Sequence, residues 1–487
     1  MSNRRLPIGV IGGGPGGLAA ACTLAARGHS VVVYEARGRT GGKAGTIEVD
    51  GFRFDAGPTS LVMPRVFERI FAEADRDFGD YVALERLAPL WRGFLPGGET
   101  RDLPADPDAA SAAFGGLLEL SRRMRAAAER RLFWRPVGRL ADMVGGAAGG
   151  PLAALSDLAT LRIGRSLGGV VASHVRDDGM AGLLQTFATA NGMLPVEAPA
   201  LVCARFAEAL EGGSWYPRGG MAALVAALET LARDLGVAFR TRTPVARIAV
   251  DRRRVIGLVT EKGEMQPLSA IVSAVDSDRT YRELVGDRLG RSLAGGRRPA
   301  RQRSAFLLCL GLDRRYPHLA HENVVFSAAG DGTAEDPTCH VTAPAGADPS
   351  AAPSDGEALR VLVHVPPCRA GDDWAVLAPA WRRRILDKLA RDAGLSDLDK
   401  RIVRERIVTP ADFAARFGMD GALDGNRGRT RFRGALRPGN RCRLVDGLYL
   451  AGETAHPGPG VSSAAMSGWI AADALHRDRI RAAAGQG

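Results

Sequence analysis

The sequence predicts an α/β fold, in which a parallel, doubly wound sheet is interleaved with a second domain built from a mixed sheet and helices. Two stretches of the chain indicate the parallel sheet. Residues 7–34 have the order strand, glycine turn, helix and strand, and residues 448–475 repeat the order of strand, glycine turn and helix. The length indicates the second domain, because 487 residues exceed what one hydrophobic core usually serves.

The first strand is expected over residues 7–11, and an alanine-rich helix follows over about 16–27, where Gly28 can end it. The next strand covers residues 30–34. Because the connections are short and a helix lies between the two strands, we expect the strands to be parallel neighbours.

The glycine turn between this strand and helix has a specific chemistry. Gly12, Gly14 and Gly17 form the pattern G-x-G-x-x-G, which in this position is a Rossmann-type dinucleotide fingerprint. Gly12 permits the tight turn, Gly14 lets the backbone approach a pyrophosphate, and Gly17 lets the helix pack closely on the strand. Glu35, at the end of the second strand, is placed to accept the adenosine ribose hydroxyls. These residues alone do not separate FAD from NAD.

Two further turns favour FAD. The pattern R-x-G-G-K at residues 39–43 puts basic groups beside a second glycine turn, where they can run along the same dinucleotide and neutralise phosphate charge. The tight turn of residues 55–59 has small residues whose backbone can approach a flat ring. The contacts predicted from these turns are Arg39, Gly42, Lys43, Gly57, Pro58 and Thr59.

The C-terminal strand ends in Gly452 and Glu453 and leads through a glycine-rich turn to a helix from about Val461. Such a strand end can direct backbone amides and a carboxylate to a ribityl chain and pyrophosphate, and the new helix can direct the positive end of its dipole at an electron-rich flavin. Val245, in a strand expected over residues 243–250, completes the predicted cofactor contacts.

The middle of the chain alternates between helical and strand-like patterns. Residues 106–200 have Ala, Leu and Arg at helical spacing, whereas residues 304–312 and 359–365 resemble strands of a second sheet. A helix is expected over 372–393, and the Pro-, Gly- and Asp-rich residues 328–356 are expected to form a loop. We therefore predict FAD-binding segments at 1–105, 216–300 and 428–487, and segments of a substrate-binding domain at 106–215, which is helical, and at 301–427.

Four longer motifs identify a family resemblance. F-D-x-G-P-T occurs at residues 54–59, Y-P-x-G-G-M at 216–221, L-G-L-D-R-R-Y-P-x-L-A-H at 310–321 and T-x-H-P-G-x-G-V at 454–461. Together with the dinucleotide motifs, they make the chain similar to the amine oxidase and phytoene desaturase superfamily, and within it to bacterial phytoene desaturases. The resemblance implies FAD, a polyene or polyprenoid substrate and association with a membrane.

The expected activity is desaturation of a carotenoid or carotenoid precursor, phytoene-like or hydroxylated, by hydride transfer to flavin, with a quinone or oxygen reoxidising the cofactor. The alternatives are a flavin amine oxidase and a prenyl-lipid escort of the same fold. His456 lies next to the expected flavin-facing turn and can either accept a proton or hold the loop. His318 and His321 are expected to shape the substrate domain, and no metal site is predicted.

The chain carries 65 Lys and Arg against 54 Asp and Glu, a net charge of +11, and only four of the basic residues are lysines. This balance favours anionic lipid over nucleic acid as a partner. Residues 122–139, in which arginines alternate with apolar residues around Trp134, can lie on a bilayer or form a solvated helix that covers the core, and the resemblance favours the bilayer. We expect a cytoplasmic protein bound peripherally to the membrane.

Overall fold

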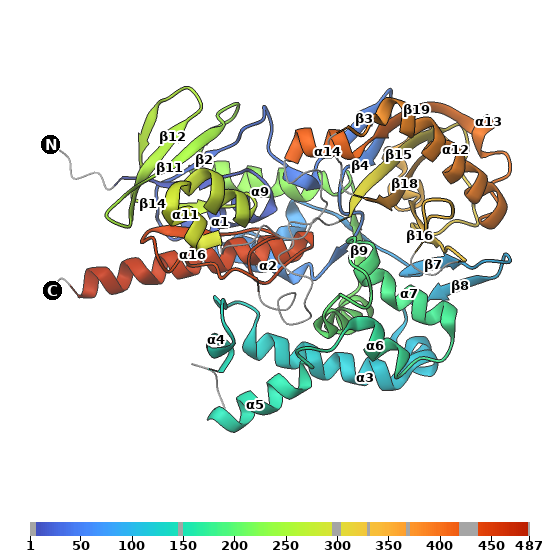
Figure 1. Cartoon of the computed structure of the whole chain (residues 1–487), viewed down its shortest axis with the longest axis horizontal. Coiled ribbons are helices and arrows are strands. Elements are labelled where there is room, and N and C mark those ends of the chain that lie inside the picture. Colours follow the sequence, from blue (N-terminus) through green and yellow to red (C-terminus); the bar gives the residue numbers. More distant parts are fainter. Residues whose placement is uncertain are drawn as a thin grey trace.

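A five-stranded parallel sheet organises one half of the molecule (Figure 1). The computed structural model describes residues 6–144, 150–294, 303–328, 332–366, 371–417 and 437–485. Strands from both ends of the chain share this sheet, because the N-terminal strand pairs with β14, which pairs in turn with the C-terminal strand. The strand order is β10 (Ala238–Arg240), β2 (Val31–Tyr34), β1 (Ile8–Ile11), β14 (Ala270–Ser273) and β20 (Leu448–Leu450).

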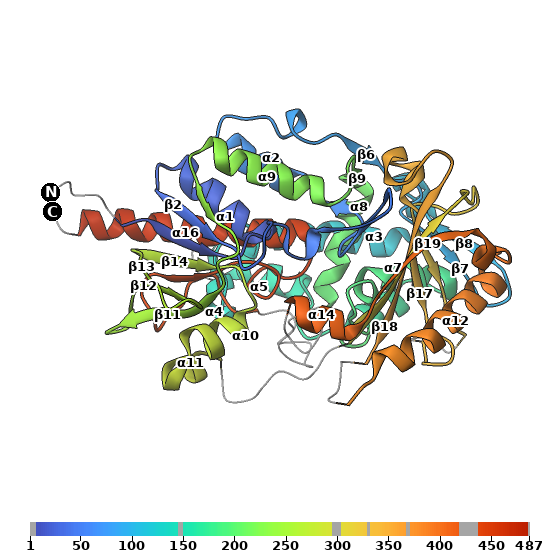
Figure 2. The same cartoon turned by 90° about the horizontal axis from the view of Figure 1, so that it is seen from above.

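Both faces of this sheet are covered, as a doubly wound sheet requires. Alternate residues of β1 point to opposite faces, so Ile8 and Val10 join the core beneath the helices while Ile11 packs with the three-stranded sheet. Figure 2 shows helices above the five-stranded sheet and β11–β13 below it. The helical side is formed by α1 (Pro15–Ala26), α2 (Arg65–Ala72), α9 (Ala222–Asp234) and α16 (Val461–Ala484), and the other side by β11 (Val245–Asp251), β12 (Arg254–Thr260) and β13 (Met265–Pro267).

Helices α1 and α16 pack unusually closely, because glycines and alanines line their contact. A Cβ on Gly468 would lie 2.0 Å from the carbonyl oxygen of Gly16, so only glycine is accommodated there. The N-terminal and C-terminal halves of the predicted cofactor site are thereby held together. The α/β fold with a parallel sheet is confirmed.

The second half of the molecule is a seven-stranded mixed sheet, covered on one face by α12 (Trp374–Asp392) (Figure 1). The strands expected near 304–312 and 359–365 and the helix expected at 372–393 are present. Its strand order is β19 (Ile402–Val408), β15 (Ser304–Leu312), β18 (Glu357–Val365), β17 (Cys339–Thr342), β16 (Glu322–Val325), β7 (Trp91–Phe94) and β8 (Thr100–Leu103).

Two features of this sheet differ from the expectation. Residues 328–356 were predicted to be a loop, but they contain β17, which is held by β16 on one side and β18 on the other. Tertiary pairing therefore overrides a local sequence rich in turn residues. The strands β7 and β8 lie within the predicted segment 1–105, yet they belong to this second sheet through the parallel pairing of β7 with β16.

A helical layer lies along one edge of both sheets, at the bottom of Figure 1. It consists of α3 (Pro107–Arg131), α4 (Leu140–Val144), α5 (Gly150–Thr160), α6 (Leu167–Ala172), α7 (Asp178–Thr189) and α8 (Ala204–Glu211). Smaller elements connect the layers: β3 (Thr46–Val49), β4 (Phe52–Asp55), β5 (Leu61–Val62), β6 (Leu84–Arg86), β9 (Ser214–Pro217), α10 (Ser277–Arg279), α11 (Asp287–Ala294), α13 (Leu398–Arg401) and α14 (Pro410–Phe417).

The arginine-rich stretch of residues 122–139 packs inward. Arg122 pairs with Glu211 at 2.6 Å, and Arg131, which is fully buried, pairs with Asp157 at 2.6 Å. The ring of Trp134 meets that of Trp469 edge-on, with centroids 5.3 Å apart. The acids that neutralise these two arginines come from other helices, so this part of the stretch helps to cover the core. Within the described ranges, no helix combines the length and apolarity needed to cross a bilayer.

Candidate active site

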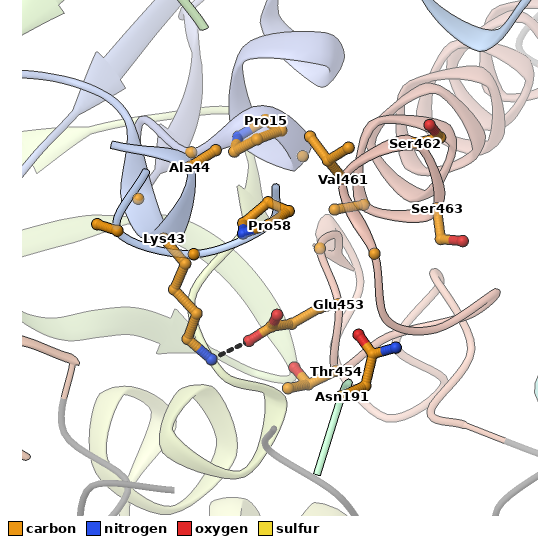
Figure 3. Close-up of a pocket in the computed structure, with 18 of the residues that line it drawn as sticks. Pro15, Lys43, Ala44, Pro58, Asn191, Glu453, Thr454, Val461, Ser462 and Ser463 are labelled. Carbon is orange, nitrogen blue, oxygen red and sulfur yellow. Dashed lines mark hydrogen bonds and ion pairs between the residues drawn. The ribbon is translucent and has the colours of Figure 1, made fainter. Parts of the chain in front are cut away.

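A cavity of about 470 Å³ lies where the five-stranded sheet, the seven-stranded sheet and the helical layer meet. Its size is within the range of roughly 300–1,000 Å³ that is common for ligand sites. At one end it is lined by residues that follow the carboxyl ends of strands β1, β2, β14 and β20, which is where ligands bind in parallel α/β sheets. Figure 3 shows residues from the N-terminal and C-terminal turns facing one another across it.

The first glycine turn forms part of the cavity wall. Gly12 has φ +99°, a conformation that favours glycine, and a Cβ on Gly17 would lie 1.9 Å from the carbonyl oxygen of Gly12. Gly14 lines the cavity, and a Cβ there would meet only the Cα of Gly42, at 3.6 Å. Helix α1 begins at Pro15 without a side-chain cap, so the positive end of its dipole is available to an anion.

The buried carboxylate of Glu35 holds this turn in place. Its Oε2 accepts a hydrogen bond from the backbone N–H of Gly13 at 2.8 Å, and its Oε1 accepts one from that of Arg37 at 2.9 Å. Glu35 also lines the cavity, as the ribose assignment requires.

The second glycine turn packs backbone to backbone against the turn of residues 55–59. A Cβ on Gly57 would lie 2.2 Å from the carbonyl oxygen of Lys43, so this approach requires glycine. Lys43 forms an ion pair with Glu453 in the C-terminal turn (Figure 3). Arg39, in contrast, is exposed and donates to the carbonyl oxygen of Thr46 at 3.2 Å, away from the cavity.

The C-terminal turn supplies a second helix N-terminus to the same cavity. Gly452 has φ +94°, and its backbone nitrogen lies 2.9 Å from where a Cβ on Gly16 would be, so the two turns are in contact. Helix α16 begins at Val461 after Gly460, without a side-chain cap and without an acidic residue in its first turn. Two uncapped helix dipoles therefore face one cavity, an arrangement suited to a phosphate at one helix and an electron-rich ring at the other.

The structure brings together most of the residues that the sequence predicts. Gly17 lies behind the wall and has the packing role expected of it, whereas Arg39 and His456 are not part of the lining. The predicted residues that do line the cavity are Gly12, Gly14, Glu35, Gly42, Lys43, Gly57, Pro58, Thr59, Val245, Gly452, Glu453 and Val461.

His456 is a buried structural residue. Its Nε2 donates to the carbonyl oxygen of Leu132, at the end of α3, over 2.7 Å, and its backbone N–H donates to the carbonyl oxygen of Pro438 at 2.9 Å. Burial lowers the pKa of His456 to about 4. The geometry therefore favours the loop-holding alternative over proton acceptance.

His318 and His321 also have structural contacts, as expected. The Nε2 of His318 donates to the carbonyl oxygen of Ala393 at 2.9 Å. The Nε2 of His321 donates to that of Thr59 at 2.9 Å, which fixes one side of the turn of residues 55–59.

The other end of the cavity has both apolar and polar walls. Leu90, Trp91, Phe187 and Leu362 provide apolar surface. The face of the seven-stranded sheet opposite α12 adds polar side chains that sequence reasoning missed: Glu322, His340, Thr342 and Arg360.

A period-2 pattern in β18 signals this polar face. Leu359, Val361 and Val363 point toward α12, so Arg360 and Leu362 point to the cavity. Arg360, which lies between apolar residues of this strand, was the signal in the sequence that could have predicted the polar face.

These polar groups are buried, and burial sets their protonation. Burial raises the pKa of the Glu322 carboxyl to about 7, although the positive charge of Arg360 acts against this. Burial also lowers the pKa of His340, which stays neutral. Arg360 Nη2 donates to the carbonyl oxygen of Gly57 at 3.0 Å, so this buried cation is tied to the turn of residues 55–59.

The site fits the dinucleotide that the sequence predicts. The wall at Gly14 is a cradle that any side chain would fill, two uncapped helices face it, and the buried carboxylate of Glu35 lines the far end.

Comparison with known proteins agrees with this geometry. A family model described as flavin containing amine oxidoreductase matches residues 15–476. The 4,4'-diapolycopene oxygenase of Methylomonas sp. is 30% identical over 98% of this chain and 99% of the relative, and the zeta-carotene-forming phytoene desaturase of Myxococcus xanthus is 33% identical over 96% and 93%. A 4,4'-diaponeurosporene oxygenase of Staphylococcus aureus is 30% identical over 96% and 97%.

Solved structures share the fold at low identity. An oxidoreductase from Methanosarcina mazei superposes with a TM-score of 0.63 at 18% identity, covering 95% of this chain and 99% of the other. Cyclohexylamine oxidase from Brevibacterium oxydans superposes with a TM-score of 0.63 at 17% identity, covering 98% of this chain and 99% of the oxidase. The chain belongs to the flavin-containing amine oxidoreductase family and is an FAD-dependent oxidoreductase.

Proposed function

We propose that this protein dehydrogenates a long polyene, a carotenoid or carotenoid precursor, by transferring hydride to FAD. The observation that carries the proposal is the near full-length match, at 30% to 33% identity, to relatives whose names all describe enzymes acting on carotenoids. The solved amine oxidases are only 16% to 18% identical, so they support the fold and not an amine substrate.

The cofactor roles follow from the walls of the cavity. The N-terminus of α1 and the backbone at Gly14 would hold the diphosphate, Glu35 the adenosine ribose, and the N-terminus of α16 with Val461 the flavin end. FAD supplies the two-electron acceptor that removal of hydride from an unactivated chain requires. The protein orients the polyene and excludes water from the reacting carbons, for which Leu90, Phe187 and Leu362 provide apolar surface.

Oxygenation is a second candidate, because two of the three relatives described above are named oxygenases. The two reactions differ in their products. Desaturation removes two hydrogens and extends the conjugation, whereas oxygenation adds an oxygen atom. The reduced cofactor would be reoxidised by a quinone or by oxygen in the first case, and oxygen would be obligatory in the second.

A lipophilic substrate also implies contact with a membrane surface, for which helix α5 is the best candidate. Its Leu152 and Leu155 are 82% and 60% exposed, and they are three residues apart on one helical face. The helix lies at the outer edge of the helical layer in Figure 1. Two large exposed apolar side chains on one peripheral helix are suited to shallow insertion into a bilayer.

The experiment combines flavin-loaded protein with liposomes that carry phytoene, neurosporene or hydroxylated neurosporene, and follows the absorption spectrum and the product mass. A red shift with loss of two hydrogens from one of these lipids supports the proposal. A product that contains labelled oxygen from O₂ favours the oxygenase alternative. Turnover of a water-soluble amine, with no polyene changed, contradicts both.

A further inference from the structure

Three residues form one polar row across the face of the seven-stranded sheet that borders the cavity. In the register of the sheet, Glu322 of β16 lies opposite Thr342 of β17, and Thr342 lies opposite Arg360 of β18. Residues in such a row point to the same face, and all three line the cavity. The row therefore puts a carboxyl group and a guanidinium into the wall at the substrate end.

The polar atoms of this wall are buried and incompletely paired. Glu322 is 3% exposed, and its Oε1 has no hydrogen-bond partner in the part of the chain that the structure describes. The same holds for Nε of Arg360 and Nδ1 of His340. Leaving a buried polar atom unpaired is unfavourable, so an unpaired carboxylate oxygen in the wall of a cavity indicates that it acts on a molecule that enters the cavity.

The wall is also connected to the turn that is predicted to face the flavin. Arg360 donates to the carbonyl oxygen of Gly57, and His321, the neighbour of Glu322, donates to that of Thr59. Glu322 therefore lies beside the Gly57–Thr59 backbone.

The other acids that line the cavity already have partners. Both carboxylate oxygens of Glu35 accept backbone hydrogen bonds, and Glu453 pairs with Lys43. Asp276 accepts from the backbone N–H groups of Asp278 and Arg279. Glu322 alone among these acids is placed at the substrate end, where the side chains of Thr59 and Ser60 hydrogen-bond with its carboxyl group while its Oε1 has no partner among the described residues.

We infer that Glu322 is the proton acceptor of the reaction, an inference that rests on the proposed dehydrogenation. A polyene loses a hydride, with its electron pair, from one carbon to the flavin and a proton from the neighbouring carbon to the Glu322 carboxylate. The electron pair of the second C–H bond becomes the new C=C bond. The carboxylate also stabilises the positive charge that develops on the polyene as the hydride leaves. Glu322 afterwards returns its proton to solvent.

The charges that face Glu322 suit this role. Burial disfavours the Glu322 carboxylate, whereas hydrogen bonding to the side chains of Thr59 and Ser60 and the positive charge of Arg360 from β18 favour it. The negative charge of Asp55 from β4 acts with burial, and the balance leaves the pKa of Glu322 at about 7. Neutral His340 lies one row away on β17. The ring of His321 is tilted against that of Tyr216, with the centroids 4.4 Å apart, and the Tyr216 hydroxyl donates to Asp55 at 2.8 Å. A general base acts best when its pKa is near the working pH.

The test compares Glu322→Gln with a matched control, Glu357→Gln. Glu357 is also buried in this sheet, and burial likewise raises its pKa to about 7. It does not line the cavity, and its Oε1 accepts from the backbone N–H groups of Ala345 and Ala358, which the amide oxygen of glutamine can replace.

With a polyene substrate in liposomes, Glu322→Gln should lower kcat by about 100-fold or more while flavin content and KM stay near the wild-type values. Glu357→Gln should keep wild-type turnover. The wild-type kcat should rise with pH through about 7 to a plateau, and Glu322→Gln should lose this rise, while Glu322→Asp recovers part of the activity and the pH dependence.

Three results would overturn the inference: a Glu322→Gln variant as active as the wild type, a wild-type rate that does not depend on pH near 7, or equal losses in both glutamine variants. A wild-type protein that changes no polyene would reject the proposed function itself, and the inference with it. Because the wild-type pH profile needs no variant, a misfolded Glu322→Gln protein does not prevent the test.

Discussion

Lys43 and Glu453 form an ion pair although 410 residues of chain separate them (Figure 3). The pair joins the second glycine turn to the C-terminal turn, and both side chains line the cavity. Since the two turns come from opposite ends of the chain, this contact and the neighbouring approach of Gly16 to Gly452 assemble the cofactor site.

A double-mutant cycle with Lys43→Met and Glu453→Gln should show a favourable coupling of about 0.5–1 kcal/mol in the free energy of unfolding, because the pair is partly exposed. Urea unfolding of the wild type, the two single variants and the double variant measures this coupling. The exposed pair of Arg404 with Asp50 is the control and should show a coupling close to zero. Equal couplings for the two pairs would mean that the Lys43 pair does not hold the turns together.

Gly14→Val should abolish flavin binding without unfolding the protein. A Cβ at Gly14 meets only the Cα of Gly42, at 3.6 Å, so the fold tolerates it, but the added side chain enters the space of the diphosphate. Flavin absorbance of the purified protein and its melting temperature measure the two effects. Gly346→Val, at an exposed glycine with open space around its Cα, should keep the yellow colour. A yellow Gly14→Val protein would place the dinucleotide elsewhere.

His456 should make the free energy of unfolding decrease as the pH falls. Burial lowers its pKa from the ordinary 6.5 to about 4 in the folded protein, so protonation favours unfolding. The stability that neutral His456 contributes is therefore lost as pH falls from about 6.5 toward 4. His456→Gln keeps a donor for Leu132 and cannot be protonated in this range. Its free energy of unfolding should therefore fall less steeply than that of the wild type between these pH values.

The catalytic pH profile separates the two roles of His456. His456→Gln should retain the wild-type dependence of kcat on pH, because the side chain does not reach the cavity. Loss of that dependence would restore His456 as the proton acceptor and remove Glu322 from that role.

Leu152→Glu combined with Leu155→Glu should weaken binding to anionic liposomes about tenfold or more, because two apolar side chains no longer insert and two negative charges are added. Co-sedimentation of each protein with anionic vesicles measures this binding. Val376→Glu on α12, where the valine is 70% exposed, is the control and should bind as the wild type does. Equal binding by all three proteins would exclude α5 as the membrane contact.

The sequence predicts the cofactor half of the site well because the signals there are local. Gly12 and Gly14 are needed by the backbone of a single turn, and Glu35 follows directly from the end of the next strand. Such requirements can be read without knowing which strands pair.

The substrate half depends on pairing that local patterns do not contain. Glu322, Thr342 and Arg360 meet only through the register of three strands, one of which lies in a stretch predicted to be a loop. The contact of Trp134 with Trp469 is likewise absent from local patterns, because the two residues lie far apart along the chain. His456 is close to the flavin-facing turn in sequence, but its ring points to the carbonyl oxygen of Leu132.

If one cavity places a polyene against the flavin, both molecules should change together in an anaerobic single turnover. Flavin-loaded protein is mixed with a polyene in liposomes without oxygen, and the flavin and polyene absorbances are followed together. The flavin should bleach while the polyene spectrum shifts to the red at the same rate, with one flavin reduced per double bond formed. Flavin that stays oxidised with every polyene, yet bleaches with an amine, would contradict this placement.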